Sequence, residues 1–275
     1  MGRKRLKMEN NLKDKVAFIT GAAHGQGRAV AIALAKEGCN IAALDVAKKI
    51  EYPNYNFGCP EELVMLKKEI KDLGQECISF CADVRDEKAV NDAVIETINK
   101  FGKIDILFNN AGICAYAKVD EMTNAEWDSM LDINLKGAFI VTRSVVKYMK
   151  ERKSGVIINN SSTMGLRGGN RLSHYTASKW GLTGFTKAIA IELAPYNIRA
   201  VSIHPTGVNT PMNDGLASLE GKTPIEIAEA SAGNLLPTPW IEPEDVADLV
   251  VYLAGNKARY ITGAQYVLDA GLLTV

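Results

Sequence analysis

The sequence has few cysteines, no excess of charge of either sign and no apolar run long enough to cross a membrane. Its Lys and Arg total 32 and its Asp and Glu total 32, so a formal net charge of +0 indicates no extended surface for nucleic acid or an anionic membrane. The basic first residues lack the apolar core of a signal peptide, and we interpret residues 1–13 as a flexible tail. We therefore expect a cytoplasmic protein whose partner is a small, roughly neutral molecule.

The five cysteines are an odd number, and none has the CxxC spacing of a zinc or redox site. Cys77 and Cys81 lie four residues apart in an apolar run, so a strand would place both on one face. We expect the cysteines to be small buried apolar side chains in a reducing compartment, and we expect no metal site. They are Cys39, Cys59, Cys77, Cys81 and Cys114.

The sequence does contain apolar segments at regular intervals. Hydrophobic residues make up 47% of the chain, which is enough for a large core. Apolar β-branched runs alternate with amphipathic helical stretches, which predicts an α/β domain with a mostly parallel, doubly wound sheet covered on both faces. We predict one domain over residues 14–275 with about seven strands. The runs lie at 16–20, 40–46, 77–84, 104–112, 155–162, 198–205 and 264–271.

Two connections are longer than a loop of an α/β unit needs. One spans about 46–60 and carries three aromatic residues, and the other spans about 211–243 and includes a short helical stretch at 224–232. Ligands of doubly wound sheets bind beyond the carboxyl ends of the strands, where both insertions start, so both are candidate lids. The alternative is that both connections are surface loops that cover no ligand. The aromatic residues are Tyr52, Tyr55 and Phe57.

A glycine-rich turn follows the first apolar run in the segment TGAAHGQG, which contains Gly21, Gly25 and Gly27. Glycine lets the backbone approach a pyrophosphate, and the helix that follows offers free amides and a positive end. A tight turn without a ligand is the alternative, but the strand before, the helix after and the acidic residue that ends the second run favour a dinucleotide site.

That acidic residue, Asp45, indicates which nicotinamide cofactor binds. A carboxylate accepts hydrogen bonds from the ribose diol of NAD and repels the 2′-phosphate of NADP. Val46 follows it, so no arginine is ready to receive that phosphate, although His24 and Lys48 lie nearby in the sequence. The sequence therefore favours NAD.

Two further parts of the sequence are candidates to contact the cofactor. Asp83, at the end of the third run, has two interpretations that we leave open, a contact to the adenine amino group and a cap of the following helix. Residues 109–112, with the sequence NNAG, are expected to pack against a ribose.

The segment HYTASK places Tyr175 and Lys179 one helical turn apart on one face. A nearby ammonium favours the phenolate and would bring the pKa of Tyr175 toward neutrality, so that the phenol can exchange the proton that accompanies hydride transfer. Ser162 is a candidate hydrogen-bond donor to the substrate oxygen. Asn134 is expected to interrupt a helix and hold a water leading from Lys179 to solvent.

Each of these residues also has a purely structural interpretation, such as packing, a solvated charge, a turn or a cap. Their order beside a dinucleotide turn favours the chemical one. We assign structural or supporting roles to His174 and His204.

The motifs TGxxxGxG, NNAG, the Asn of LDINLKG, the serine and YxxxK, in this order, resemble the short-chain dehydrogenase/reductase family from Lys15 to Val275. The resemblance implies a Rossmann-like fold, a catalytic tetrad of Asn134, Ser162, Tyr175 and Lys179, and a homotetramer. The expected cofactor contacts are then Gly21, His24, Gly25, Gln26, Gly27, Asp45, Val46, Asp83, Val84, Asn110, Ala111, Gly112, Tyr175, Lys179, Pro205, Gly207, Val208 and Thr210.

The long loop after Asp45, the GQGR after His24 and the segment HPTGVNTPM are similar to the carveol-dehydrogenase-type, mycofactocin-associated branch of that family. In that branch the insertion covers the nicotinamide and makes NAD hard to exchange. The resemblance implies that residues 52–57 form such a cover and that a dedicated redox partner serves the tightly held NAD. Two departures are His24, where arginine is frequent, and Thr206, where glycine is frequent.

These observations predict an NAD(H)-dependent oxidoreductase that interconverts a secondary alcohol and a ketone on a hydrophobic or cyclic skeleton. Plausible substrate-pocket walls are Cys114, Met164, Leu166 and Trp240. One alternative is a 3-oxoacyl-thioester reductase that uses NADPH. Another is a nicotinamide-binding sensor without chemistry.

Overall fold

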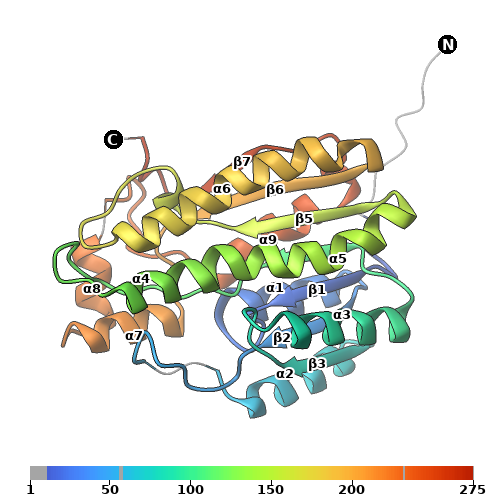
Figure 1. Ribbon diagram of the computed structural model, residues 1–275, viewed down its shortest axis with the longest axis horizontal. Helices are drawn as coiled ribbons and strands as arrows, with labels where there is room; N and C mark the ends of the chain where they lie inside the picture. The colour runs from blue at the N-terminus through green and yellow to red at the C-terminus, as the bar shows by residue number, and fades with distance from the viewer. Residues whose placement is uncertain (1–10, 56–57, 232, 275) are drawn as a thin grey trace.

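Seven parallel strands cross the computed structural model, which describes residues 11–55, 58–231 and 233–274 (Figure 1). Their order in the sheet is β3-β2-β1-β4-β5-β6-β7, and every neighbouring pair is parallel. This confirms the predicted α/β, doubly wound sheet. The strands are β1 (Val16–Thr20), β2 (Asn40–Asp45), β3 (Cys77–Cys81), β4 (Ile106–Asn109), β5 (Gly155–Asn160), β6 (Ile198–Pro205) and β7 (Gln265–Leu268).

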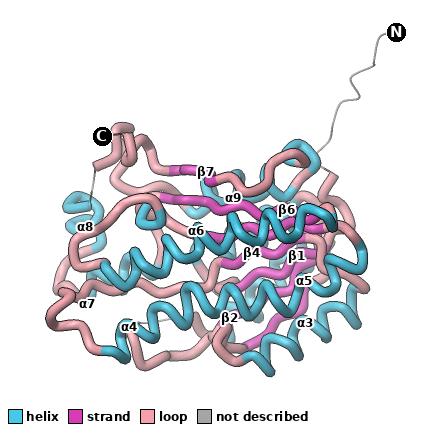
Figure 2. Tube along the Cα trace, turned by 45° about the horizontal axis from the view of Figure 1, so that its top comes forward, coloured by secondary structure: helices cyan, strands magenta, loops and turns pink. Residues whose placement is uncertain are grey.

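Helices cover both faces of the sheet (Figure 2). One layer contains α1 (Gly25–Lys36), α2 (Pro60–Asp72) and α9 (Pro243–Ala254), and the other contains α3 (Glu87–Phe101), α5 (Ala138–Arg152) and α6 (Ser173–Leu193). The remaining elements are α4 (Asn124–Leu131), a π-helix (Asp132–Gly137), α7 (Pro211–Leu219), α8 (Pro224–Ser231) and three 3₁₀ turns (Thr163–Gly165, Ala194–Tyr196 and Asn256–Ala258).

The core follows from the two-residue period of the strands. In β1, Phe18 packs into the apolar cluster beneath α3 and α5, whereas Ile19 packs into the cluster beneath α1 and α9. Both side chains are fully buried, and burying each contributes about 1.5–3 kcal/mol relative to leaving it exposed. An unbroken apolar run such as β1 therefore requires helices on both faces.

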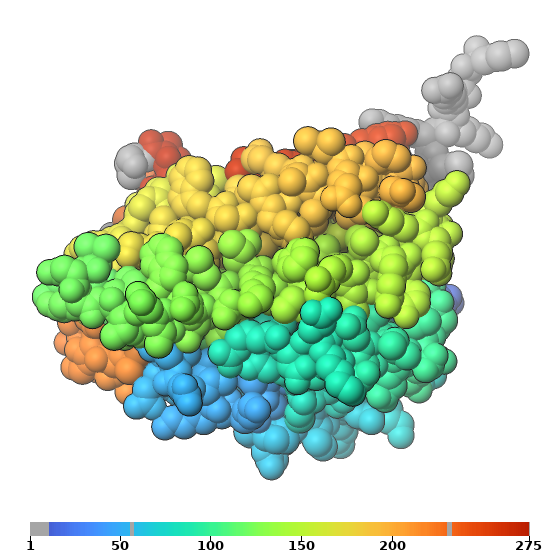
Figure 3. Space-filling model, viewed as in Figure 1, coloured from blue at the N-terminus to red at the C-terminus, as the bar shows by residue number. Residues whose placement is uncertain are grey.

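The strand order reverses between β1 and β4, so the loops that leave these two strands diverge and open a crevice at the carboxyl edge of the sheet. Both insertions lie at this edge (Figure 1). The predicted helical stretch of the second insertion is α8, and a further helix, α7, precedes it. The space-filling view shows the blue first insertion beside the orange second insertion (Figure 3).

Some local expectations need correction. Leu12 is buried, and its carbonyl accepts a hydrogen bond from the Cys39 thiol, so packing begins before residue 14. Cys59 and Cys81 are exposed, because one caps α2 and the other ends the edge strand β3, whereas the other three cysteines are buried. Phe57 and residues 1–10 lie outside the described residues.

The described helices include none that is both long and apolar enough to span a lipid bilayer.

A buried carboxylate fixes the edge of the sheet opposite the crevice. Asp105, which is 4% exposed, accepts a 2.9 Å hydrogen bond from the backbone of Val16 at the start of β1. Three cations surround it: Lys15 at 3.5 Å, Lys103 at 3.2 Å and Arg152 at 3.2 Å. Burial alone would raise the pKa of Asp105, but the Val16 amide and the lysines outweigh it and hold the pKa below its usual value.

We expect Asp105→Asn to lower the free energy of unfolding by about 2 kcal/mol, because it removes the buried charged acceptor of the Val16 amide and leaves three partly exposed cations without their shared anion. The folded-state pKa of Asp105 is depressed, so this contribution is present above the ordinary carboxyl pKa and is lost as the pH falls through the folded-state value. Urea denaturation at neutral and acidic pH measures it. Asp72→Asn, in an exposed pair with Lys68, is the control and should change little. A difference between native protein and Asp105→Asn that does not shrink in acid would contradict the assignment.

Candidate active site

The glycine turn is shaped for a close ligand. Gly21 and Gly25 adopt left-handed backbone conformations, with φ of 65° and 54°. A side chain on Gly27 would collide with the carbonyl of Gly21, so this glycine lets α1 pack against the end of β1. The Asn110 amide donates to the carbonyls of Thr20 and Gly21 at 3.1 and 3.0 Å. The turn is therefore held open at the N-terminus of a helix, an arrangement that receives a pyrophosphate.

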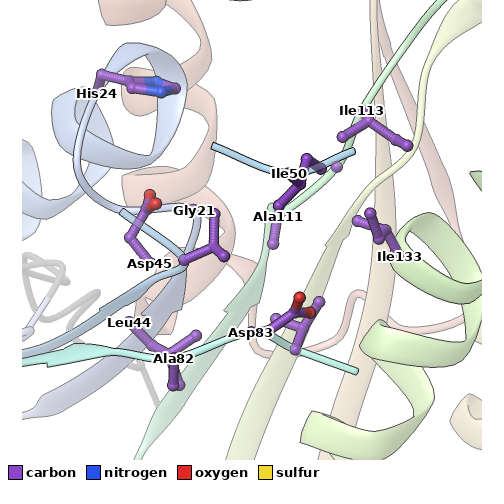
Figure 4. A pocket seen from close by; sticks show the side chains of 13 residues that line it. Gly21, His24, Leu44, Asp45, Ile50, Ala82, Asp83, Ala111, Ile113 and Ile133 are labelled. Carbon is purple, nitrogen blue, oxygen red and sulfur yellow. The ribbon is translucent and has the colours of Figure 1, made fainter. Parts of the chain in front are cut away.

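Asp45 lies at the end of β2 beside this turn and lines the same pocket as Gly21 and His24 (Figure 4). Its Oδ2 accepts from the backbone of Ala23 at 3.0 Å and its Oδ1 from Ala47 at 2.9 Å. Each carboxylate oxygen keeps a free acceptor site, because it can accept more than one hydrogen bond. The pair of oxygens fits a ribose diol, and no arginine lines the pocket to bind a 2′-phosphate.

Asp83 also lines this pocket, but the cap interpretation is wrong. The N-cap of α3 is Asp86, whose side chain accepts from the amide of Ala89. Asp83 instead binds the Arg85 side chain, with contacts of 2.7 and 3.1 Å. Burial opposes ionisation, but the Arg85 hydrogen bonds prevail and lower the pKa of Asp83.

The residues of the NNAG segment differ in place: one is buried and supports the ends of the strands, and others line the pocket of Asp45. The side chain of Asn109 is buried and donates to Thr142 and Asn159, so it does not contact a ribose as expected. Ala111 and Gly112 line the pocket. Five aliphatic residues that the motifs did not indicate line it too, and several face Asp45 across it (Figure 4). They are Leu44, Ile50, Ala82, Ile113 and Ile133.

Further along the crevice, Tyr175 and Lys179 lie on one face of α6, and the Lys179 ammonium is 5.6 Å from the centre of the Tyr175 ring. The Ser162 side chain lies close enough to Tyr175 to lower the pKa of its phenol, and both residues line the second cavity described below. Both tyrosine and lysine line the part of the crevice that also contains Gly21, Gly25 and Gln26. The structure therefore brings the predicted acid/base group to the glycine turn.

The pKa values differ from the expectation. Burial raises the pKa of Tyr175, and the Ser162 hydrogen bond opposes this only in part. Burial lowers the pKa of Lys179 to about 8. The lysine spacing alone does not bring the phenol to neutrality, because desolvation of the phenolate outweighs it.

Asn134 lies in the π-helix, which confirms the predicted interruption of a helix. Its side chain binds both backbone groups of Ile113, at 2.8 and 2.9 Å, and donates to Ser178 at 3.1 Å. Asn134 and Lys179 both lie within 4 Å of the place that a side chain on Gly112 would take. The Asn134 side chain therefore holds the strand-end loop and α6 together.

Asn160 is a site residue that the motifs did not indicate. Its carbonyl accepts a 2.8 Å hydrogen bond from the Lys179 ammonium, and its amide donates to Gln26 at 2.9 Å and Asn110 at 2.8 Å. The only signal in the sequence is its position at the end of β5, two residues before Ser162. Asn160 links the lysine to the glycine turn.

The two histidines support other groups. His204 is buried, its Nδ1 hydrogen-bonds to the Ser162 carbonyl at 2.8 Å and its Nε2 to Ser202 at 2.8 Å. Burial lowers the pKa of both His204 and His174. His174 Nε2 lies 2.9 Å from the Tyr52 hydroxyl.

A second cavity of about 830 Å³, open to solvent, extends from Ser162 and Tyr175 toward the second insertion. Predicted cofactor residues Gln26, Gly207, Val208 and Thr210 line it, and Pro205 ends β6 behind it. Of the predicted substrate walls, Cys114, Met164 and Trp240 are present, but Leu166 is not among its lining residues. Two other predicted cofactor residues, Val46 and Val84, line the pocket of Asp45 and not this cavity.

The first insertion reaches across the site to the second. Tyr55 is buried, accepts a hydrogen bond from the Cys114 amide at 3.3 Å and packs so closely on α7 that a side chain on Gly215 would strike its ring. Tyr52 binds His174, next to Tyr175. The two insertions therefore meet over the crevice.

No group of three or more His, Cys, Asp or Glu side chains suited to a metal ion occurs within residues 11–55, 58–231 and 233–274. The arrangement thus presents hydroxyl, phenol and amine groups next to a turn suited to a dinucleotide.

Residues 15–220 match the family model described as short chain dehydrogenase. The chain is 38% identical over 271 residues to the (-)-trans-carveol dehydrogenase of Rhodococcus erythropolis, covering 94% of this chain and 98% of that protein. It is 35% identical over 262 residues to a 3-oxoacyl-acyl-carrier-protein reductase of Thermotoga maritima, covering 95% and 99%.

Among solved structures, carveol dehydrogenase from Mycobacterium avium in complex with NAD superimposes with a TM-score of 0.93 at 35% identity, covering 97% of this chain and 100% of that one. The glycine turn, the YxxxK helix and the seven-stranded sheet agree with these matches. The chain belongs to the short-chain dehydrogenase/reductase family of oxidoreductases.

Proposed function

We propose that this enzyme interconverts a secondary alcohol and a ketone on a hydrophobic or cyclic skeleton, with NAD(H) as cofactor and Tyr175 as the acid/base. The observation that carries the proposal is the position of Tyr175, which lines both the part of the crevice that contains Lys179 and the glycine turn and the cavity that contains Ser162. Apolar and aromatic side chains such as Met164, Leu216 and Trp240 form part of the wall of the second cavity and support a hydrophobic substrate.

Bound NAD would supply the hydride acceptor in alcohol oxidation and the hydride donor, as NADH, in ketone reduction. In reduction, Tyr175 donates its proton to the carbonyl oxygen, and Ser162 donates a hydrogen bond that stabilises charge on that oxygen. In oxidation, Tyr175 accepts the hydroxyl proton. Lys179, held by Asn160, supplies a positive charge that favours the phenolate when its own amine is protonated.

The proposed cofactor is NAD because Asp45 offers two carboxylate oxygens where NADP would bring a phosphate. The NAD complex of the Mycobacterium avium carveol dehydrogenase supports this choice. The Thermotoga maritima relative keeps a thioester reductase as the second candidate, and its tetrad chemistry would be the same.

We expect Tyr175→Phe to lower turnover by about a thousand-fold or more, because the variant cannot exchange the proton on the substrate oxygen. NAD binding should be unchanged, since the phenol oxygen is not part of the glycine turn. Steady-state rates with a panel of cyclic ketones and calorimetric NAD titration measure the two effects. Tyr260→Phe, at a side chain that is 87% exposed, is the control. A Tyr175→Phe variant that kept its rate would refute the acid/base assignment, and NAD binding without turnover by the native protein would favour the sensor alternative.

The contact between the two insertions supports a cover over the nicotinamide. We propose that the cover slows NAD exchange and that a dedicated redox partner reoxidises the bound NADH. Tyr55 contributes to this contact, because it touches the Cys114 segment and α7 at once.

We expect purified protein to retain NAD(H), not NADP(H), and to turn over poorly with added NAD alone. Mass spectrometry of small molecules released on denaturation measures cofactor identity and retention together. Tyr55→Ala should remove retained NAD(H) and speed exchange, whereas Tyr260→Ala should not. Released NADP(H) would favour the thioester reductase, and free cycling of native protein with added NAD would rule out the cover.

We also propose a homotetramer, in which α4, α5 and α6 form one interface. Large apolar side chains are exposed on these helices without a covering element in the described chain: Trp127, Phe139, Trp180 and Ile191. We expect light scattering to give the mass of four chains, and Ile191→Glu to reduce it. The mass of a single chain for the native protein would contradict the proposal.

A further inference from the structure

The second cavity contains one charged side chain among its lining residues, that of Arg167. Much of the rest of the wall is apolar or aromatic, with Met164, Leu216 and Trp240 as examples. A guanidinium does not lose its charge at physiological pH, so any substrate in this cavity shares it with a fixed positive charge.

Arg167 has no anionic partner within the described residues. The ion pairs that arginines make there involve other arginines, and the Nε of Arg167 is buried without a hydrogen-bond partner. The Nε of the neighbouring Arg171 is also buried without a partner, but Arg171 differs from Arg167 because both of its terminal nitrogens bind Glu220, at 2.7 and 3.0 Å. A buried guanidinium nitrogen without an acceptor is costly, and a ligand that accepts a hydrogen bond from it relieves that cost.

The backbone of Arg167 is fixed on both sides. Its amide donates to the carbonyl of Thr163 at 3.0 Å, and its carbonyl accepts a 3.4 Å hydrogen bond from the Trp180 indole on α6. Thr163 begins the 3₁₀ turn that Ser162 caps. The backbone from which the Arg167 side chain extends is therefore held in a set position relative to Ser162.

The location of Arg167 separates it from the cofactor. It lines neither the pocket of Asp45 nor the part of the crevice that contains Gly21 and Lys179. It shares a cavity with Ser162 and Tyr175, which face the substrate under the proposed function. Although several predicted cofactor residues also line this cavity, Arg167 lies outside the two pockets of the glycine turn, so we assign the group that it binds to the substrate.

Resting on the proposed function, we propose that the substrate is an apolar alcohol or ketone that also carries a carboxylate, and that Arg167 binds this carboxylate. The planar guanidinium matches a carboxylate with two parallel hydrogen bonds. Ser162 and Tyr175 bind the reacting oxygen at the other end of the molecule. Arg167 then determines specificity for an oxo acid or hydroxy acid over the neutral compound of the same skeleton.

Binding of unreactive probes tests the proposal. Cyclohexanecarboxylate and cyclohexanecarboxamide differ chiefly in charge, and calorimetric titration into NAD-loaded protein compares their affinities.

We expect the native protein to bind the carboxylate about ten-fold or more tightly than the amide. Arg167→Gln should abolish that preference. Arg167→Lys should keep part of it, because lysine keeps the positive charge but lacks the two parallel N–H donors of the guanidinium. Arg259→Gln, which removes one charge near the opposite edge of the sheet, is the matched control and should keep the preference. Equal binding of the two probes, binding of neither, or an unchanged preference in Arg167→Gln overturns the proposal.

Turnover separates this proposal from the proposed function. With NADH, 4-oxocyclohexanecarboxylate should have a lower KM than its methyl ester, and Arg167→Gln should raise the KM of the acid but not that of the ester. Reduction of both compounds with equal KM overturns the carboxylate proposal and leaves the oxidoreductase function standing. Carboxylate binding through Arg167 without reduction of either compound supports the carboxylate site and contradicts the oxidoreductase function.

Discussion

The hydrogen bond from the buried Lys179 ammonium to the Asn160 carbonyl connects the two halves of the site. Burial lowers the pKa of Lys179 to about 8, so the ammonium depends on the acceptors around it to persist near neutral pH. The Asn160 amide binds Gln26 and Asn110, and Asn110 in turn holds the glycine turn. Helix α6 and the glycine turn are therefore one hydrogen-bonded unit, and a shift of either would move the other.

The parts of this unit that the sequence predicts are those set by local spacing. Tyr175 and Lys179 share a face because one helical turn separates them, and the glycines are required by the left-handed conformations at Gly21 and Gly25. The sheet follows in the same way, because apolar runs that alternate with helices admit few topologies. Asn134 was also predicted to interrupt a helix, and it lies in the π-helix.

What the sequence does not predict depends on partners distant in the chain or on burial. Asn160 acquires its role from Lys179, Gln26 and Asn110, which lie far from it in sequence. Asp83 is a local exception, because its carboxylate pairs with Arg85, two residues away, and Asp86 caps α3 in its place. The raised pKa of Tyr175 reflects desolvation, which spacing along a helix does not report.

Under the proposed function, the two insertions join access of the substrate to access of the cofactor. Tyr55 packs on α7, and the same helix supplies Met212 and Leu216 to the second cavity. Opening the first insertion far enough to release a dinucleotide would remove the support of α7 and so disturb the wall of the substrate cavity. Arg171 adds a second tie, because its ion pair with Glu220 holds the end of α7 to the loop before α6. Substrate that fills the cavity and packs on α7 would thus favour the closed cover, which couples retention of the cofactor to occupation of the substrate site.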